Sequence, residues 1–212
     1  MHGCNIGGGF FVIIGKERFL RGITMKLLIT VMTAVALFAG TNVPKTLSPM
    51  LDKLRYTNAV VEVDDADFHH EDDEIAFVFT YSNYAWTRTY TVTFVTCGGE
   101  KYYLDLSDEE NVKTEELLPR LRKEIDKKKF ASDHDKNLIR TCVLEAEKID
   151  KNAEFTREHA ACDAGSRDVY SAVDGELLLL CESGDFCGKL HDEHAELIVG
   201  ILDEAGLATV WK

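Results

Sequence analysis

The feature that most constrains the fold is the ten-residue series RTYTVTFVTC at 88–97, which consists almost entirely of β-branched and aromatic residues. Such residues favour the pleated, half-buried surface of a β-sheet. Further strand-like segments occur at 57–63, 74–81, 102–108, 153–159, 167–173 and 176–181. The pair Asp174-Gly175 separates the last two and is a strong hairpin signal. The sequence therefore predicts a sheet built largely from antiparallel strands.

At Glu109 the composition switches to helix-forming residues, with amphipathic segments around 114–129 and 134–150, before the strand-like segments return at 153. A third helix is predicted over 186–205, ended by Gly206. Its expected buried stripe comprises Leu190, His194, Leu197, Ile198, Ile201 and Leu202. Strands followed by helices, more strands and a closing helix indicate an α+β protein, predicted here as a five-stranded OB-fold-type barrel with about three helices.

The N-terminal part contains Met25-Lys26 followed by the apolar run LLITVMTAVALFAG. This run is too short to span a bilayer of about 30 Å and ends in small residues, which is typical of a secretory signal. We expect an upstream extension at 1–24, a signal peptide at 25–40, a polar leader at 41–56 and one domain at 57–212. The protein is then secreted or periplasmic and does not stay inserted in a membrane; a retained membrane anchor is the alternative.

The charge of the chain is strongly acidic, with 37 Asp and Glu against 24 Lys and Arg, a net charge of −13. Removal of residues 1–40 would make the remainder more acidic, because that segment holds more basic than acidic residues. This charge disfavours nucleic acid as a partner, since a polyanion must find local positive charge or a bound cation. The sequence identifies no protein partner.

The cysteines beyond the predicted signal are Cys97, Cys142, Cys162, Cys181 and Cys187. In an exported protein they predict up to two disulfides and one free thiol. The connectivity stays open, with a short loop closed by Cys181 and Cys187 as the favoured pairing.

Three separated segments resemble the staphylococcal nuclease (thermonuclease) family. They are AVVEVDDADFHH at 59–70, YTVTFVTCGGE at 90–100 and HAELIVGILDEAGLATVW at 194–211. The resemblance implies an OB-fold and calcium-dependent hydrolysis of nucleic-acid phosphodiesters. Such chemistry needs a hard cation, guanidinium groups and an oriented water around the phosphate.

Carried over from the family motifs, Asp65 and Asp67 correspond to the turn aspartates that bind calcium, although Ala66 replaces the glycine between them. Glu100 corresponds, with a shift of one residue, to the glutamate that activates water. The second family arginine falls on Arg167 or on Glu176. Because Thr91 and Thr96 stand where the family has an arginine and an aspartate, the resemblance implies a degenerate active site. The alternative is an inactive OB-fold binding module stabilised by disulfides.

Other residue groups suggest different chemistry. His69 and His70 lie among carboxylates and could bind zinc, copper or calcium, whereas a solvated acidic loop is the simpler interpretation, since neighbouring strand residues face opposite ways. A C-x5-C-x3-H-x2-H run, formed by Cys181, Cys187, His191 and His194, has the donors of a zinc site. His159 and Cys162 are the only hint of a thiol hydrolase, and no flanking signature supports it.

Overall fold

The computed structural model describes residues 55–85, 87–109, 112–126, 130–133, 135–159 and 165–208. All of them belong to the compact unit Leu51–Lys212. The predicted extension, signal peptide and most of the leader lie outside the described residues. Within the described ranges, no helix is both long and apolar enough to cross a membrane.

The described strands form one antiparallel sheet in the order β4-β3-β2-β1-β6-β7-β8-β5. Its strands are β1 Ile75–Asn83, β2 Thr89–Thr96, β3 Glu100–Asp105, β4 Phe130–Asp133, β5 Phe155–His159, β6 Ser166–Ser171, β7 Leu178–Gly184 and β8 Phe186–Leu190. Two meanders, β1-β2-β3 and β6-β7-β8, meet where β1 pairs with β6. Helical segments connect β3 to β4 and β4 to β5, which places β4 and β5 at opposite edges of the sheet.

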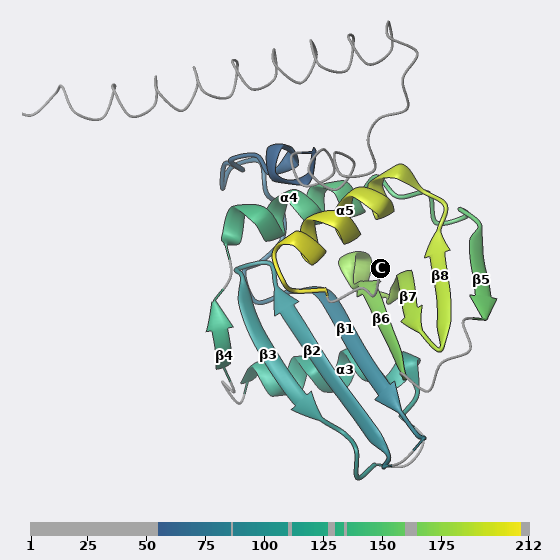
Figure 1. Cartoon of the computed structure of the whole chain (residues 1–212). Coiled ribbons are helices and arrows are strands. Elements are labelled where there is room, and N and C mark those ends of the chain that lie inside the picture. The colour runs from purple at the N-terminus through teal and green to yellow at the C-terminus, as the bar shows by residue number, and fades with distance from the viewer. Residues whose placement is uncertain are drawn as a thin grey trace, which may run out of the picture. The chain divides into compact units, whose positions relative to one another are not determined.

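Helices cover both faces of the sheet, with α4 (Lys136–Ala146) and α5 (Glu193–Glu204) on one face and α3 (Thr114–Asp126) on the other (Figure 1). Alternation along β1 and β2 divides the apolar side chains between two cores. Phe77 and Val95 pack in the core beneath α4 and α5, whereas Val78 and Phe94 pack in the core that includes Leu117 and Leu121 of α3.

Local signals in the sequence set the ends of the two helices α4 and α5. The side chain of Asp135 accepts hydrogen bonds from the N–H groups of Asn137 and Leu138 at the start of α4. Asp192 likewise caps α5 through the N–H groups of His194 and Ala195. Such caps satisfy donors that the first helical turn leaves unpaired. Gly206, at φ 71°, follows the end of α5 as predicted.

The predicted α+β class is confirmed, whereas the five-stranded OB-type barrel is wrong: within the described residues the sheet has eight strands and is open. The segment 57–63 is not a strand. Residues 55–59 are helical, and the residues after them lie against α4. There the N–H of Val61 donates to Thr141 Oγ1 at 3.2 Å, so this backbone bonds to helix side chains.

The predicted helix over 186–205 combines two elements, because residues 186–190 form β8 and only Glu193–Glu204 form α5. The Asp192 cap marks the true start of the helix.

The predicted disulfide between Cys181 and Cys187 is absent. Of the cysteines that lie in the described ranges, Cys97, Cys142, Cys181 and Cys187 are all free thiols, and only Cys187 is exposed. In the β7–β8 pairing Cys181 stands opposite Lys189, so Cys187 is a diagonal neighbour, beyond disulfide reach. Cys162 lies outside the described residues.

Candidate functional site

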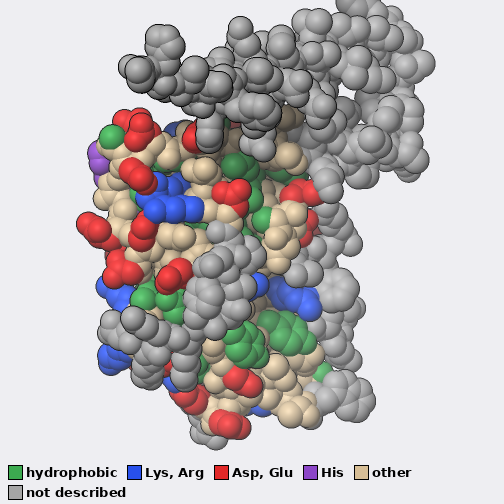
Figure 2. Space-filling view, turned by 90° about the vertical axis from the view of Figure 1, so that its left-hand side faces the viewer, with side chains coloured by type: hydrophobic (Ala, Val, Ile, Leu, Met, Phe, Trp, Pro, Cys, Tyr) green, Lys and Arg blue, Asp and Glu red, His purple; other side chains and the backbone are tan. Residues whose placement is uncertain are grey.

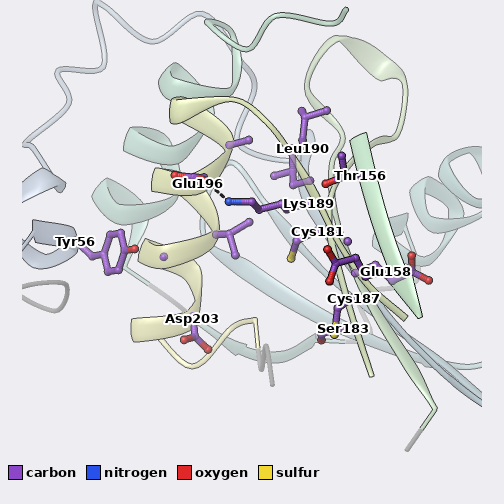
Figure 3. A pocket seen from close by; sticks show the side chains of 16 residues that line it. Tyr56, Thr156, Glu158, Cys181, Ser183, Cys187, Lys189, Leu190, Glu196 and Asp203 are labelled. Carbon is purple, nitrogen blue, oxygen red and sulfur yellow. Dashed lines mark hydrogen bonds and ion pairs between the residues drawn. The ribbon is translucent and has the colours of Figure 1, made fainter. Parts of the chain in front are cut away.

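A groove of about 540 Å³ lies between α5 and the strands β7, β8 and β5 (Figure 3). Its apolar lining comes from the helix and from the strands, and consists of Leu180, Cys181, Leu190, Ala195 and Val199. Leu180, Leu190 and Ala195 are almost fully buried, so the floor of the groove belongs to the core beneath α5. The size is that of a pocket for a small organic molecule.

Strand pairing determines which side chains reach the groove. Cys181 on β7 stands opposite Lys189 on β8, and Lys189 stands opposite Thr156 on β5. Residues that are directly opposite in a sheet point to the same face, so these three side chains project together toward α5 (Figure 3). On the helix, Ala195 and Val199 are four residues apart and therefore share the face that lines the groove.

A glycine in α5 makes room for an aromatic ring beside the groove. A Cβ atom on Gly200 would lie 2.2 Å from ring atoms of Tyr56, so only glycine lets this ring rest against the helix backbone. Tyr56 also lines the groove. The segment that begins the described chain is thereby held against the last helix.

Acidic side chains outnumber basic ones around the groove. Among the described residues, the carboxylates of Glu158, Glu196 and Asp203 and the single basic side chain of Lys189 lie around it; Glu182 contributes backbone, because its side chain points to the opposite face of β7 from Cys181. Lys189 Nζ lies 2.8 Å from Glu196 Oε1, an ion pair visible in Figure 3. Glu158 is exposed and enters no ion pair with the residues that the structure describes. The groove therefore offers a cation-attracting rim over an apolar floor.

On the opposite face of β7 from Cys181, the buried Glu182 lies next to a second carboxylate. Glu182 on β7 stands directly opposite Asp168 on β6. Burial raises the pKa of Asp168, against the opposing effect of hydrogen bonds from the hydroxyls of Thr80 (3.0 Å) and Tyr170 (3.1 Å). Burial and the neighbouring Asp168 also raise the pKa of Glu182, although Arg157 Nε lies 2.6 Å from its Oε2. Like charges directly opposite in a sheet are destabilising.

The contribution of this pair to the pH dependence of stability has a sign that follows from the raised pKa values. Because both folded-state pKa values lie above their unfolded values, the folded chain binds these protons more tightly than the unfolded chain does. The pair therefore destabilises the fold at neutral pH, and the penalty decreases as the pH falls through the folded pKa values. We expect Asp168→Asn to stabilise the protein at pH 7 by up to about 1 kcal/mol and to flatten this dependence.

Urea unfolding at a series of pH values measures the Asp168→Asn effect, with the exposed Asp108→Asn as the matched control. A loss of stability at pH 7 in Asp168→Asn, or an equal change in both variants, would contradict the prediction.

The structure places the predicted calcium ligands on the exposed loop that precedes β1. The carboxylate of Asp65 accepts a hydrogen bond from the guanidinium of Arg140 on α4, so it neutralises a cation of the protein itself. The side chain of Asp67 is exposed, and its N–H donates to the carbonyl oxygen of Asp64 at 3.1 Å. The two aspartates therefore have different surroundings.

The predicted catalytic residues lie toward opposite ends of the sheet. Glu100 begins β3 next to the end of β2, where Thr96 pairs with Ile75, and its carboxylate accepts a hydrogen bond from Tyr102 at 2.6 Å. Arg167 pairs with Tyr81 near the other end of β1, and its guanidinium lies 4.9 Å from the centre of that ring. From Ile75 to Tyr81 the strand extends roughly 20 Å. The alternative position, Glu176, is exposed beside the turn that precedes β7.

The histidines and cysteines of the C-x5-C-x3-H-x2-H run have separate partners. His191 Nε2 lies 2.7 Å from the hydroxyl of Thr156, and His194 Nδ1 lies 2.7 Å from Glu145 on α4. Cys181 is buried on β7, whereas Cys187 is exposed on β8. These four residues therefore do not assemble a zinc site. Of the proposed thiol-hydrolase pair, Cys162 and the side chain of His159 lie outside the described residues.

The groove was not anticipated from the sequence. Val199 belongs to α5 and Leu180 to β7, and apolar positions of this kind are predicted only as core. The signal that could have indicated the groove is the pair of glycines Gly188 and Gly200, each of which admits an aromatic ring where a side chain would otherwise stand. No protein-family model, curated protein or solved structure matches this chain.

Proposed function

We propose that this protein is an exported, non-catalytic binding protein whose groove beneath α5 holds a small organic cation with an apolar body. The observation that supports it is the combination of an apolar floor with a rim where, among the described residues, three carboxylates accompany one lysine. The apolar part of such a ligand would lie on Leu180, Leu190 and Val199. Its ammonium group would lie at the rim, near Glu158.

Electrostatics support a cation over an anion. Lys189 is already paired with Glu196, so an incoming carboxylate or phosphate would meet acidic side chains without an available positive charge among those that line the groove. Elsewhere, the face in Figure 2 shows Lys and Arg side chains placed among Asp and Glu rather than gathered into a basic surface. Together with the net charge of −13, this arrangement disfavours a polyanion.

Calcium-dependent nuclease activity is the prediction that follows from the family resemblance, and the positions of its residues favour the non-catalytic alternative. Phosphodiester hydrolysis needs its carboxylates and guanidinium groups within a few ångströms of one phosphate. Arg167 and Glu100 lie at opposite ends of the strands, and Asp65 is bonded to Arg140. We expect the purified protein to leave single-stranded DNA intact with calcium and with chelator alike.

The binding proposal is tested with two ligands that share a phenyl ring and a two-carbon linker but differ in charge, phenethylamine and hydrocinnamate. We expect isothermal titration calorimetry of the full chain at pH 7 to show binding of the amine at least about tenfold tighter than of the acid. Val199→Trp should abolish binding because it fills the groove, and Glu158→Gln should weaken it. Glu193→Gln removes an exposed charge from α5 outside the groove and should have no effect.

Equal affinity for the two probes would overturn the charge preference. Binding that persists in Val199→Trp would place the ligand elsewhere, and no binding of either probe would overturn the proposal for this ligand class.

A further inference from the structure

A cluster of three different metal-ligating side chains lies at the end of the sheet near the start of β1, away from the groove. His70 and Glu74 belong to the loop before β1, and Cys97 follows the last residue of β2. One ligand atom from each, a ring nitrogen, a carboxylate oxygen and a thiol sulfur, lies within 4.8 Å of the other two. His70 Nδ1 and Glu74 Oε2 are 2.7 Å apart.

Backbone hydrogen bonds hold the two segments of this cluster together. The N–H of Cys97 donates to the carbonyl oxygen of Glu74 at 2.8 Å, and the N–H of Gly98 donates to that of Asp72 at 2.8 Å. A Cβ atom on Gly98 would lie 2.9 Å from the same Asp72 oxygen, so the glycine permits this close approach. The thiol is therefore fixed beside Glu74 by main-chain geometry.

A fourth residue orients the histidine. His70 Nε2 lies 2.9 Å from Oε1 of Glu147, the residue that follows α4. A metal would bind the neutral tautomer of His70, in which Nε2–H donates to Glu147 and Nδ1 exchanges its contact with Glu74 for a bond to the ion. A carboxylate behind a ligating imidazole sets its tautomer and orientation in many metal sites. The ring of Phe68, 5.5 Å away between centroids, packs beside it.

We propose that His70, Glu74 and Cys97 bind a zinc ion, with Glu147 as the residue that positions His70. A nitrogen, an oxygen and a sulfur donor suit Zn²⁺, whereas Ca²⁺ and Mg²⁺ take oxygen ligands. A thiol binds a metal as the thiolate, so zinc displaces the proton of Cys97 from the sulfur to solvent as the zinc–sulfur bond forms.

The fourth coordination position faces open space. A cavity of about 620 Å³ is lined by all three donors and by Asp73, Asp174 and Arg122. Three protein ligands with one open position leave room for water or a small ligand, unlike a closed structural site with four protein ligands. The site is therefore accessible to an ion from solvent.

The test replaces zinc with cobalt, whose spectrum reports its ligands. We expect the reduced, chelator-treated full chain to bind Co²⁺ with a sulfur-to-cobalt charge-transfer band and with the intense visible bands of four-coordinate cobalt, both removed by added Zn²⁺. Cys97→Ser should abolish the charge-transfer band. His70→Gln should weaken binding by more than about 100-fold, and Glu147→Gln by roughly 10–100-fold.

Matched variants distinguish this site from accidental binding. His69→Gln removes the exposed neighbouring imidazole, and Cys187→Ser removes the exposed thiol; both should leave the spectrum and affinity unchanged. A charge-transfer band that survives in Cys97→Ser, or equal affinities in His69→Gln and His70→Gln, would overturn the proposal. Because His70 is only partly buried, its variant tests the site even where Cys97→Ser fails to fold.

Discussion

The variant Gly184→Ala is expected to lose about 3–4 kcal/mol of unfolding free energy, the largest effect predicted for a single methyl group in this protein. Gly184 ends β7 at φ 113°, where an L side chain is strained. Its Cβ atom would lie 1.9 Å from the carbonyl oxygen of Gly165, which is backbone and cannot rotate away. The same oxygen accepts the N–H of Asp185 at 3.0 Å, so relieving the clash breaks this bond.

Gly206→Ala is the matched control, because Gly206 also has a positive φ of 71° but a Cβ atom there would meet nothing within 4 Å. It should lose only the strain of the left-handed conformation, about 1–2 kcal/mol. Thermal unfolding of both variants separates strain from steric overlap, with a midpoint roughly 10 °C below wild type expected for Gly184→Ala. Equal losses in the two variants would contradict the prediction, because they would show that the backbone at Gly165 relaxes around the added methyl group.

The second large effect is expected for Arg140→Ala, at about 2–3 kcal/mol together with weaker binding of cobalt. The guanidinium of Arg140 is buried, lies 4.5 Å from the centre of the Phe68 ring and donates to Asp72 at 3.2 Å as well as to Asp65. Arg140 thus anchors to α4 the loop that carries His70 and Glu74. Because both carboxylates are exposed, most of the loss should come from packing and loop order rather than from Coulomb attraction.

Lys136→Ala is the matched control, since Lys136 Nζ reaches the same carboxylate of Asp72 at 2.8 Å from an exposed position. This surface ion pair should contribute less than about 1 kcal/mol. Urea unfolding gives the stability of both variants, and cobalt titration gives the affinity, for which roughly a tenfold loss is expected in Arg140→Ala alone. Similar losses in both variants would assign the effect to the charge on Asp72.

The strands were predictable where residue type and turn chemistry agree. The β-branched series 88–97 contains β2, and the segment 74–81 contains most of β1. The topology was not predictable, because nothing local states that β6 pairs with β1 or that β5 pairs with β8 at the far edge. The same reason explains the wrong barrel: closure depends on pairing between strands that are distant in sequence.

The candidate metal-binding residues were likewise predictable only in part. The family resemblance predicts metal ligands in the acidic segment before β1, with Asp65 and Asp67 as the expected ligands. In the structure His70 and Glu74 of that segment lie close to Cys97. The sequence indicates Cys97 only as one of the cysteines that could form disulfides. The i,i+4 spacing of His70 and Glu74 is visible in the sequence, but their proximity to Cys97, just after β2, depends on the backbone hydrogen bonds of the fold.

The C-terminal end of α4 contacts a histidine next to each of the two proposed sites. Glu145 holds His194 at the start of α5, beside the groove, and Glu147, two residues later, holds His70 at the proposed zinc site. A ligand that displaced this turn would alter both imidazole contacts at once. Thermodynamic linkage then makes the effect reciprocal: whatever factor the amine imposes on zinc affinity, zinc imposes on amine affinity.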